Sequence, residues 1–151
     1  MATRHKARIA SRARFKNAPF SAEQMQSLGN ALRDSVRDRI RRATDVYDAP
    51  APPLKPHRNN PNSSYAAIKV RRFGGQPIRD WWRTGRTLRS LHVLTVSINR
   101  VVVGFTDSVS NFRAFINNRR HRQFGMSPQD RNNVLAKFFE LLRSFSIRRA
   151  A

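Results

Sequence analysis

The sequence contains no cysteine, and this absence excludes disulfide bonds, a thiol nucleophile and a cysteine-ligated zinc site. It also lacks any apolar run near the ~20 residues needed to span a bilayer. Its amino-terminal stretch is charged and has no apolar core of the kind found in secretory signals. We therefore expect no membrane association, no classical export and assembly inside a cell.

Acidic residues are also scarce. The chain has 9 Asp and Glu against 30 Lys and Arg, which gives a formal net charge of +21. Such an excess makes a compact monomer repel itself, so we expect an acidic partner, either nucleic acid or an acidic protein surface. The 151 residues, 39% of them hydrophobic, are enough to bury the core of one domain.

Recognisable catalytic sets are missing as well. The histidines are far apart in the sequence and show no metal-ligand spacing: His5, His57, His92 and His121. No Gly-x-Ser-x-Gly motif is present. Asp34 and Asp38 lie one helical turn apart, but arginines at i+3 and i+4 explain this spacing as helix ion pairs. We therefore expect a non-enzymatic protein with no cofactor and no metal site.

The strongest strand signal lies in residues 84–106. Two apolar runs, 92–98 and 101–106, are separated by the short polar break at 99–100. In each run, every second side chain is apolar and falls on one side of an extended chain, which is the expected inner face. These residues are Leu94, Val96 and Ile98 in the first run, and Val101, Val103 and Phe105 in the second. The pattern predicts a β-hairpin. Two strands are marginal alone, so helices or further strands must cover them.

Two long helices are predicted on either side of this hairpin. The first begins with a Ser21–Gln24 capping box and runs to about residue 44. Its apolar stripe consists of Met25, Leu28, Leu32, Val36, Ile40, Ala43 and Tyr47. Short helical turns are expected at 65–69 and at 112–116.

The second long helix is predicted over about 128–146. Ser127 suits the N-cap, Pro128 the first helical position, and Asp130 the position where a carboxylate closes a capping box. Its expected apolar stripe consists of Val134, Leu135, Phe138, Phe139, Leu142 and Phe145.

The expected organisation is a basic arm at 1–20, one domain at 21–147 with a proline-rich loop at 49–64, and a short tail at 148–151. The arm carries only cationic charges: Arg4, Lys6, Arg8, Arg12, Arg14 and Lys16. We expect it to be extended or disordered and to contact DNA or an acidic protein. A solubilising tail is the alternative.

A series of short motifs at 64–69, 74–78, 84–91, 102–104 and 122–130 resembles, in order and spacing, the tailed-phage virion-morphogenesis family. These are the neck and tail-completion proteins of the head–tail junction. The motif positions carried over to this chain are Thr84, Gly85, Gly104, Gly125, Ser127 and Asp130. The chain departs from the family pattern at residues 62–64, at Trp81–Trp82 and at 112–115.

The resemblance implies an α+β fold with a small antiparallel sheet flanked by two long helices. It also implies a structural subunit of a head–tail connector ring, acting as a neck, tail-completion or tail-terminator protein between portal-side and tail-side components. Such a ring, six-fold or twelve-fold, would surround double-stranded DNA in the virion after assembly in the host cytoplasm. The alternative is a free-standing basic nucleic-acid-binding protein, which the charge alone supports equally well.

Two sets of residues are candidates for contacts within this assembly. The hairpin edge or the proline-rich loop is expected to meet the neighbouring subunit, with Trp81 or Trp82 as an aromatic anchor at or near that interface. Arg119, Arg120 and Arg122 are expected to contact DNA in the lumen or an acidic partner. The alternative is that these arginines belong to an evenly charged, solvated surface.

Overall fold

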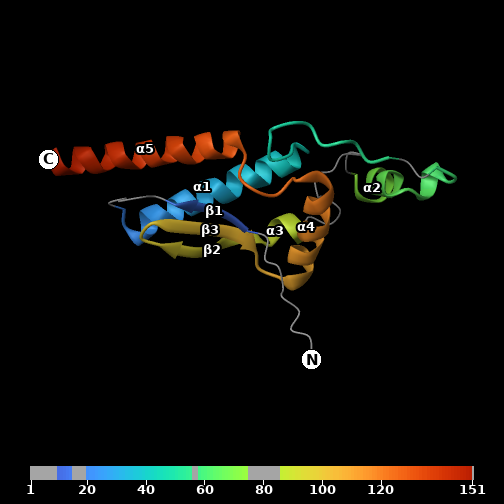
Figure 1. The fold of residues 1–151 in the computed structure, drawn as a ribbon, viewed down its shortest axis with the longest axis horizontal. Coiled ribbons are helices and arrows are strands. Elements are labelled where there is room, and N and C mark those ends of the chain that lie inside the picture. Colours follow the sequence, from blue (N-terminus) through green and yellow to red (C-terminus); the bar gives the residue numbers. More distant parts are fainter. Residues whose placement is uncertain (1–9, 15–19, 56–57, 75–85, 151) are drawn as a thin grey trace, which may run out of the picture.

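The computed structural model describes residues 10–14, 20–55, 58–74 and 86–150 (Figure 1). Its elements, in chain order, are β1 (Ala10–Arg14), α1 (Ala22–Arg41), the 3₁₀ turn η1 (Pro61–Ser63), α2 (Tyr65–Phe73), α3 (Arg86–Arg89), β2 (Leu91–Ser97), β3 (Arg100–Phe105), α4 (Ser108–His121) and α5 (Pro128–Ala150). A three-stranded antiparallel sheet of order β1-β3-β2 combines with these helices, so the predicted α+β fold is confirmed.

The predicted hairpin is present as β2 and β3. Ser97 pairs with Arg100, so Ile98 and Asn99 form a two-residue turn. A bulge between Val93 and Thr95 shifts the register of β2, and such an extra residue reverses which side chains face inward. Val93 and Val96 therefore both pack against the core, so the predicted inner face is confirmed at Val96. The prediction is wrong at Ile98, which lies in the turn and is 75% exposed.

The second strand of the hairpin has the face that its alternation predicts. Val101, Val103 and Phe105 are all buried in the core. Because β3 is the central strand, this buried row lies in the middle of the sheet's inner face.

Part of the expected arm belongs to the sheet. Residues Ala10–Arg14 form the edge strand β1, which pairs antiparallel with β3. Ser11 and Ala13 are buried on the inner face while Arg12 and Arg14 are exposed. The expectation of an arm outside the core is wrong for this segment, because backbone pairing with β3 holds the strand and only small side chains need burial.

Helix α1 covers the inner face of the sheet. The Ser21–Gln24 capping box is present, with the Gln24 amide donating to Ser21 Oγ at 3.3 Å and the Ser21 amide to Gln24 Oε1 at 2.9 Å. The predicted apolar stripe is confirmed at five positions whose side chains are fully buried: Met25, Leu28, Leu32, Val36 and Ile40. The helix ends at Arg41, so the predicted inclusion of Tyr47 is wrong; Tyr47 is 64% exposed.

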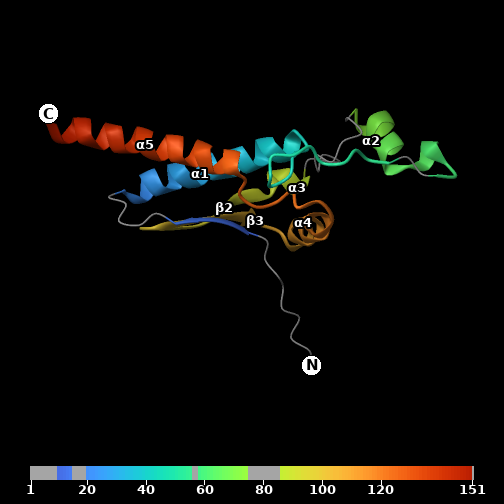
Figure 2. The ribbon, with the colours of Figure 1, turned by 45° about the horizontal axis from the view of Figure 1, so that its top comes forward.

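Helix α5 forms a third layer on the far side of α1 from the sheet (Figure 2). Val134, Phe138 and Leu142 face the core, and the Phe138 ring meets Phe20 edge to face at 5.1 Å. Leu135 and Phe139 are exposed, so the predicted stripe was too wide. The helix also continues beyond the predicted end, and its last turns project past α1 (Figure 1).

The two predicted helical turns are full helices. Helix α2 lies with η1 to one side of the sheet, whereas α4 lies across one end of the sheet beside α3 (Figures 1 and 2). The Asp107 side chain caps α4 by accepting the Ser110 amide at 2.8 Å.

Candidate functional site

A buried ion pair joins the end of α1 to the start of α5. Arg39 Nε donates to Asp130 Oδ2 at 2.7 Å, and the two side chains are 0% and 1% exposed. The remaining guanidinium nitrogens donate to backbone carbonyls, Nη1 to Gln123 O at 2.8 Å and Nη2 to Gly125 O at 2.7 Å. Buried charges are stable only when they are paired and hydrogen-bonded in this way.

The Asp130 carboxylate is satisfied from several sides. The predicted capping box is confirmed, since the Ser127 amide donates to Asp130 Oδ2 at 3.0 Å and the Asp130 amide to Ser127 Oγ at 3.1 Å. Ser35 Oγ donates to the other carboxylate oxygen at 2.8 Å. The network therefore positions the loop between α4 and α5 on α1, and its burial leaves it no access to a substrate.

Sequence reasoning missed the role of Arg39, because it considered arginines of this helix only as partners of nearby acids. The available signal was its position, because Arg39 follows Leu32 and Val36 at the spacing of the buried stripe. The expected helix ion pairs are confirmed for other arginines of this helix. Arg37 lies 3.7 Å from Asp34, and Arg41 lies 3.5 Å from Asp38.

The loop held by Arg39 lies beside the predicted cluster of arginines at the end of α4. Gly125 has a φ of 149°, and a Cβ there would lie 3.0 Å from Val46 Cγ1, so any other residue would be strained. The Val46 amide donates to the carbonyl of Arg122 at 2.9 Å. The ends of α1 and α4 thereby come together across a long stretch of sequence.

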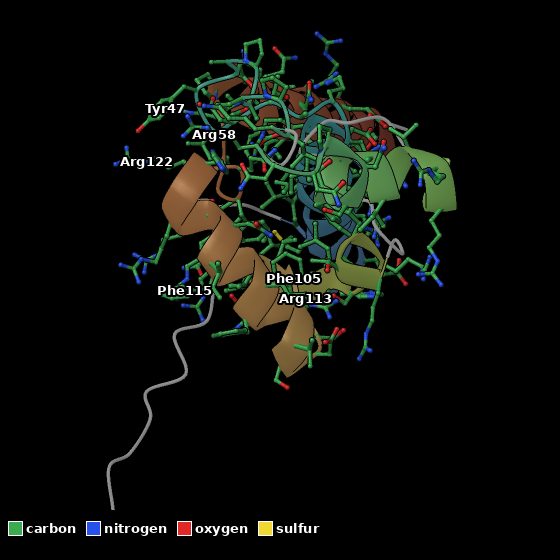
Figure 3. The ribbon with its side chains drawn as sticks, turned by 90° about the vertical axis from the view of Figure 1, so that its right-hand side faces the viewer. Tyr47, Arg58, Phe105, Arg113, Phe115 and Arg122 are labelled. Carbon is green, nitrogen blue, oxygen red and sulfur yellow. The ribbon has the colours of Figure 1, made fainter. Side chains whose placement is uncertain are left out.

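Arg119 and Arg122 line an open hollow of about 590 Å³ at this junction, together with Val46, Phe115 and Met126. Arg122 Nη1 donates to the Tyr47 hydroxyl at 2.7 Å, and both side chains lie at the same edge of the molecule (Figure 3). The guanidinium carbon of Arg119 lies 6.0 Å from the centre of the Phe115 ring.

The apolar lining of the hollow suits an apolar side chain of a partner, and its two arginines suit a carboxylate beside that side chain. The position of Arg119 and Arg122 also has a purely structural explanation, since cations near a helix C-terminus interact favourably with the helix dipole. Arg120 lies in α4, but its side chain is outside the described part of the structure. The predicted contacts of Arg119, Arg120 and Arg122 with DNA or an acidic partner stay predictions.

A second group of arginines lies on the outer face of the sheet, opposite α1. Arg12 and Arg14 are exposed on β1, and Arg14 pairs directly with the half-buried Arg100 of β3. Sequence reasoning placed the first two on an arm and did not connect them with Arg100. Only the pairing of β1 with β3 brings these side chains together.

Several exposed apolar side chains form a third surface feature. Val109, Phe112 and Ile116 recur at spacings of three and four along α4 and are 42%, 62% and 38% exposed. This spacing places them on one face of the helix. On α5, Leu135 and Phe139 are likewise exposed one turn apart.

Other predicted site residues are not all described. Those that lie outside the described residues are Arg4, Lys6, Arg8, Lys16, Trp81, Trp82, Thr84 and Gly85. Gly104 is buried in β3, where it pairs with Ala10 and His92.

The described residues show no arrangement that points to metal chemistry. Among them, no group of three or more His, Cys, Asp or Glu side chains is placed to hold a metal ion. Within the same ranges, no helix combines the length and apolarity needed to cross a bilayer. No family model, curated protein or solved structure matches this chain. Its function must therefore be inferred from its own residues.

Proposed function

We propose that this chain is a structural, non-enzymatic subunit of a homo-oligomeric ring in the head–tail connector of a tailed phage. In this role it joins portal-side and tail-side components around the DNA channel. The observation that carries the proposal of an assembly is the exposed stripe of Val109, Phe112 and Ile116 on α4. The phage setting rests on the motif resemblance.

The stripe on α4 has the character of a contact surface. Single exposed apolar residues are ordinary, but three on one helical face form a contiguous patch of the kind that marks protein interfaces. The exposed Leu135 and Phe139 lie on another helix, α5, which packs on α1 at a distance from the end of the sheet that α4 occupies (Figures 1 and 2). Two different apolar surfaces suit a head-to-tail contact, which generates rings when the rotation closes.

The sheet also has features that suit assembly. Strands β1 and β2 are both edges, and edge strands present unpaired backbone groups that natural proteins cover or pair. The α+β fold that the resemblance implied supports the same proposal. A free-standing nucleic-acid-binding protein is the second candidate, favoured by the net charge of +21 and by the exposed Arg12 and Arg14.

The composition of purified phage particles, together with the mass of the isolated protein, tests the proposal. We expect the chain in tailed particles and a closed oligomer by native mass spectrometry. A protein absent from particles that binds DNA as a monomer would support the second candidate instead.

A pair of variants tests the surface that carries the proposal. Phe112→Asp places a charge in the α4 stripe and should yield folded monomers, which circular dichroism distinguishes from unfolded chains. Ile98→Asp is the matched control, because Ile98 is an isolated exposed residue in the hairpin turn, and it should assemble normally. Equal assembly of both variants would show that the α4 stripe is not an interface.

A further inference from the structure

We propose that the outer face of the sheet is a binding surface for the phosphate backbone of duplex DNA, with Arg12, Arg14 and Arg100 as its contacts. Helices α1 and α5 are stacked on the opposite side of the sheet, and α4 lies at its end (Figure 2). The basic side chains of this face are therefore left uncovered by the helices that form the core.

The strand register places these arginines together. Arg14 lies directly opposite Arg100, and Arg12 lies two residues along β1 on the same face, opposite Val102. Directly paired side chains in an antiparallel sheet have Cβ atoms about 5 Å apart, and residues two apart on a strand are separated by about 7 Å. Three guanidinium groups are thus confined to one small area.

No carboxylate of the described residues balances this charge. Among the described residues, none of the salt bridges involves Arg12, Arg14 or Arg100, and the strands place no acidic residue on this face. Like charges directly opposite each other destabilise a sheet. A bound polyanion would remove this repulsion, which gives the surface a physical reason to bind one.

The remaining side chains of the face favour a duplex over other acidic partners. Thr95 of β2 lies in the same row as Arg12 and carries an exposed hydroxyl that can donate to phosphate. Ser97 lies in the row of Arg14, but its hydroxyl already donates to the Arg100 carbonyl at 3.2 Å. The three strands place no Phe, Tyr or Trp on this face. Single-stranded nucleic acid is bound largely by stacking on aromatic rings, and protein interfaces use aromatic anchors, so both are disfavoured.

In the proposed ring, this face would line the lumen through which DNA passes. That placement rests on the proposed function, whereas the DNA-binding surface itself can be tested on the purified full-length protein. Oligomer mass and DNA affinity are separate measurements, so failure of either inference can be distinguished from failure of the other.

The test is fluorescence anisotropy with a labelled duplex of about 20 base pairs over a range of salt concentrations. The triple variant Arg12→Gln, Arg14→Gln, Arg100→Gln should bind at least about 30-fold more weakly at about 100 mM salt. The slope of log affinity against log salt should fall by roughly 2.7, at about 0.9 for each lost phosphate contact.

A matched control removes the same charge from exposed arginines elsewhere, through Arg72→Gln, Arg113→Gln and Arg131→Gln. It should change affinity by less than about 3-fold, because these residues make no phosphate contact in the proposal. Equal loss in both triple variants would overturn the site and indicate a diffuse effect of net charge. Competition by poly-glutamate as effective as that by unlabelled duplex would overturn the assignment to DNA.

If the triple variant does not fold by circular dichroism, the double variant Arg12→Gln, Arg14→Gln replaces it, since it leaves the β2–β3 hairpin unchanged. Its salt slope should fall by roughly 1.8. An unchanged slope in a folded double variant would overturn the proposal.

Discussion

Helices α1 and α4 have similar sequence patterns but lie in different environments. Each begins with a side chain that caps the first turn, and each carries apolar residues at spacings of three and four. On α1 the apolar stripe between Met25 and Ile40 is fully buried against the sheet and α5. On α4, by contrast, Val109, Phe112 and Ile116 are exposed. The spacing identifies an amphipathic helix, but it does not identify what covers the apolar face.

The difference follows from where each helix lies. Helix α1 is sandwiched between the sheet and α5, so both sides of its apolar stripe find partners (Figure 2). Helix α4 lies at the end of the sheet and buries Ala114, on a different face from Phe112. A second chain is the natural partner for the exposed stripe in the proposed ring.

The largest expected effect tests the buried charge on α1. Arg39→Met should lower the free energy of unfolding by about 3–5 kcal/mol, because it leaves Asp130 buried without its cation. Chemical denaturation measures this change. Arg33→Met is the control: its partner Asp34 is half exposed, so the cost should be at most about 1 kcal/mol. Similar values for both variants would show that the buried pair has no special role.

The two apolar stripes should differ directly in stability measurements. Leu32→Ala on α1 should cost about 2–5 kcal/mol, because it opens a cavity in the core. Phe112→Ala on α4 should change the free energy of unfolding of the monomer by no more than about 0.5 kcal/mol. Urea denaturation at low protein concentration measures both. A large cost at Phe112 would mean that the α4 stripe stabilises the single chain.

A smaller loss than at Arg39 or Leu32 is expected for the caps of the two helices. Ser21→Ala and Asp107→Ala should each cost about 1 kcal/mol near neutral pH. The hydrogen bond from the Ser110 amide lowers the pKa of Asp107 from its ordinary value of 3.8. The positive charge of Arg86, whose Nη2 lies 3.8 Å from Asp107 Oδ1, acts in the same direction. The charged cap therefore stabilises α4 fully above pH 3.8, and this contribution is lost as the pH falls through the lowered pKa.

Urea denaturation between neutral pH and about pH 3 separates the two caps, since a serine hydroxyl does not titrate in this range. The cost of Asp107→Ala should shrink on acidification, while the cost of Ser21→Ala should stay constant. The pH-dependent part is the smaller share, because the Asp107 side chain is 31% exposed and solvent screens its charge. A cost of Asp107→Ala that does not change with pH would exclude the ionised form as the cap.

Much of the fold could be predicted because its signals are local. The capping boxes at Ser21 and Ser127 and the hairpin each involve residues within a few positions of one another, although the turn lies at 98–99 and the predicted break was 99–100. The bulge near Leu94 could not be predicted, because an extra residue in β2 is defined only by its pairing with β3. The assignment of residues 10–14 to an arm was wrong for the same reason. This five-residue segment is a strand only because it pairs with β3, which lies far away in the sequence.

Local sequence determined where α1 and α5 begin, which residues form the hairpin, and that the chain carries a large positive charge, because caps, periodicity and composition depend only on near neighbours in the sequence. Only the tertiary structure decided which arginine is buried with Asp130, which apolar stripe remains exposed, and that Arg14 and Arg100 share one face of the sheet. These features join residues far apart in the sequence. Such contacts depend on how strands pair and helices pack, which short-range patterns do not encode.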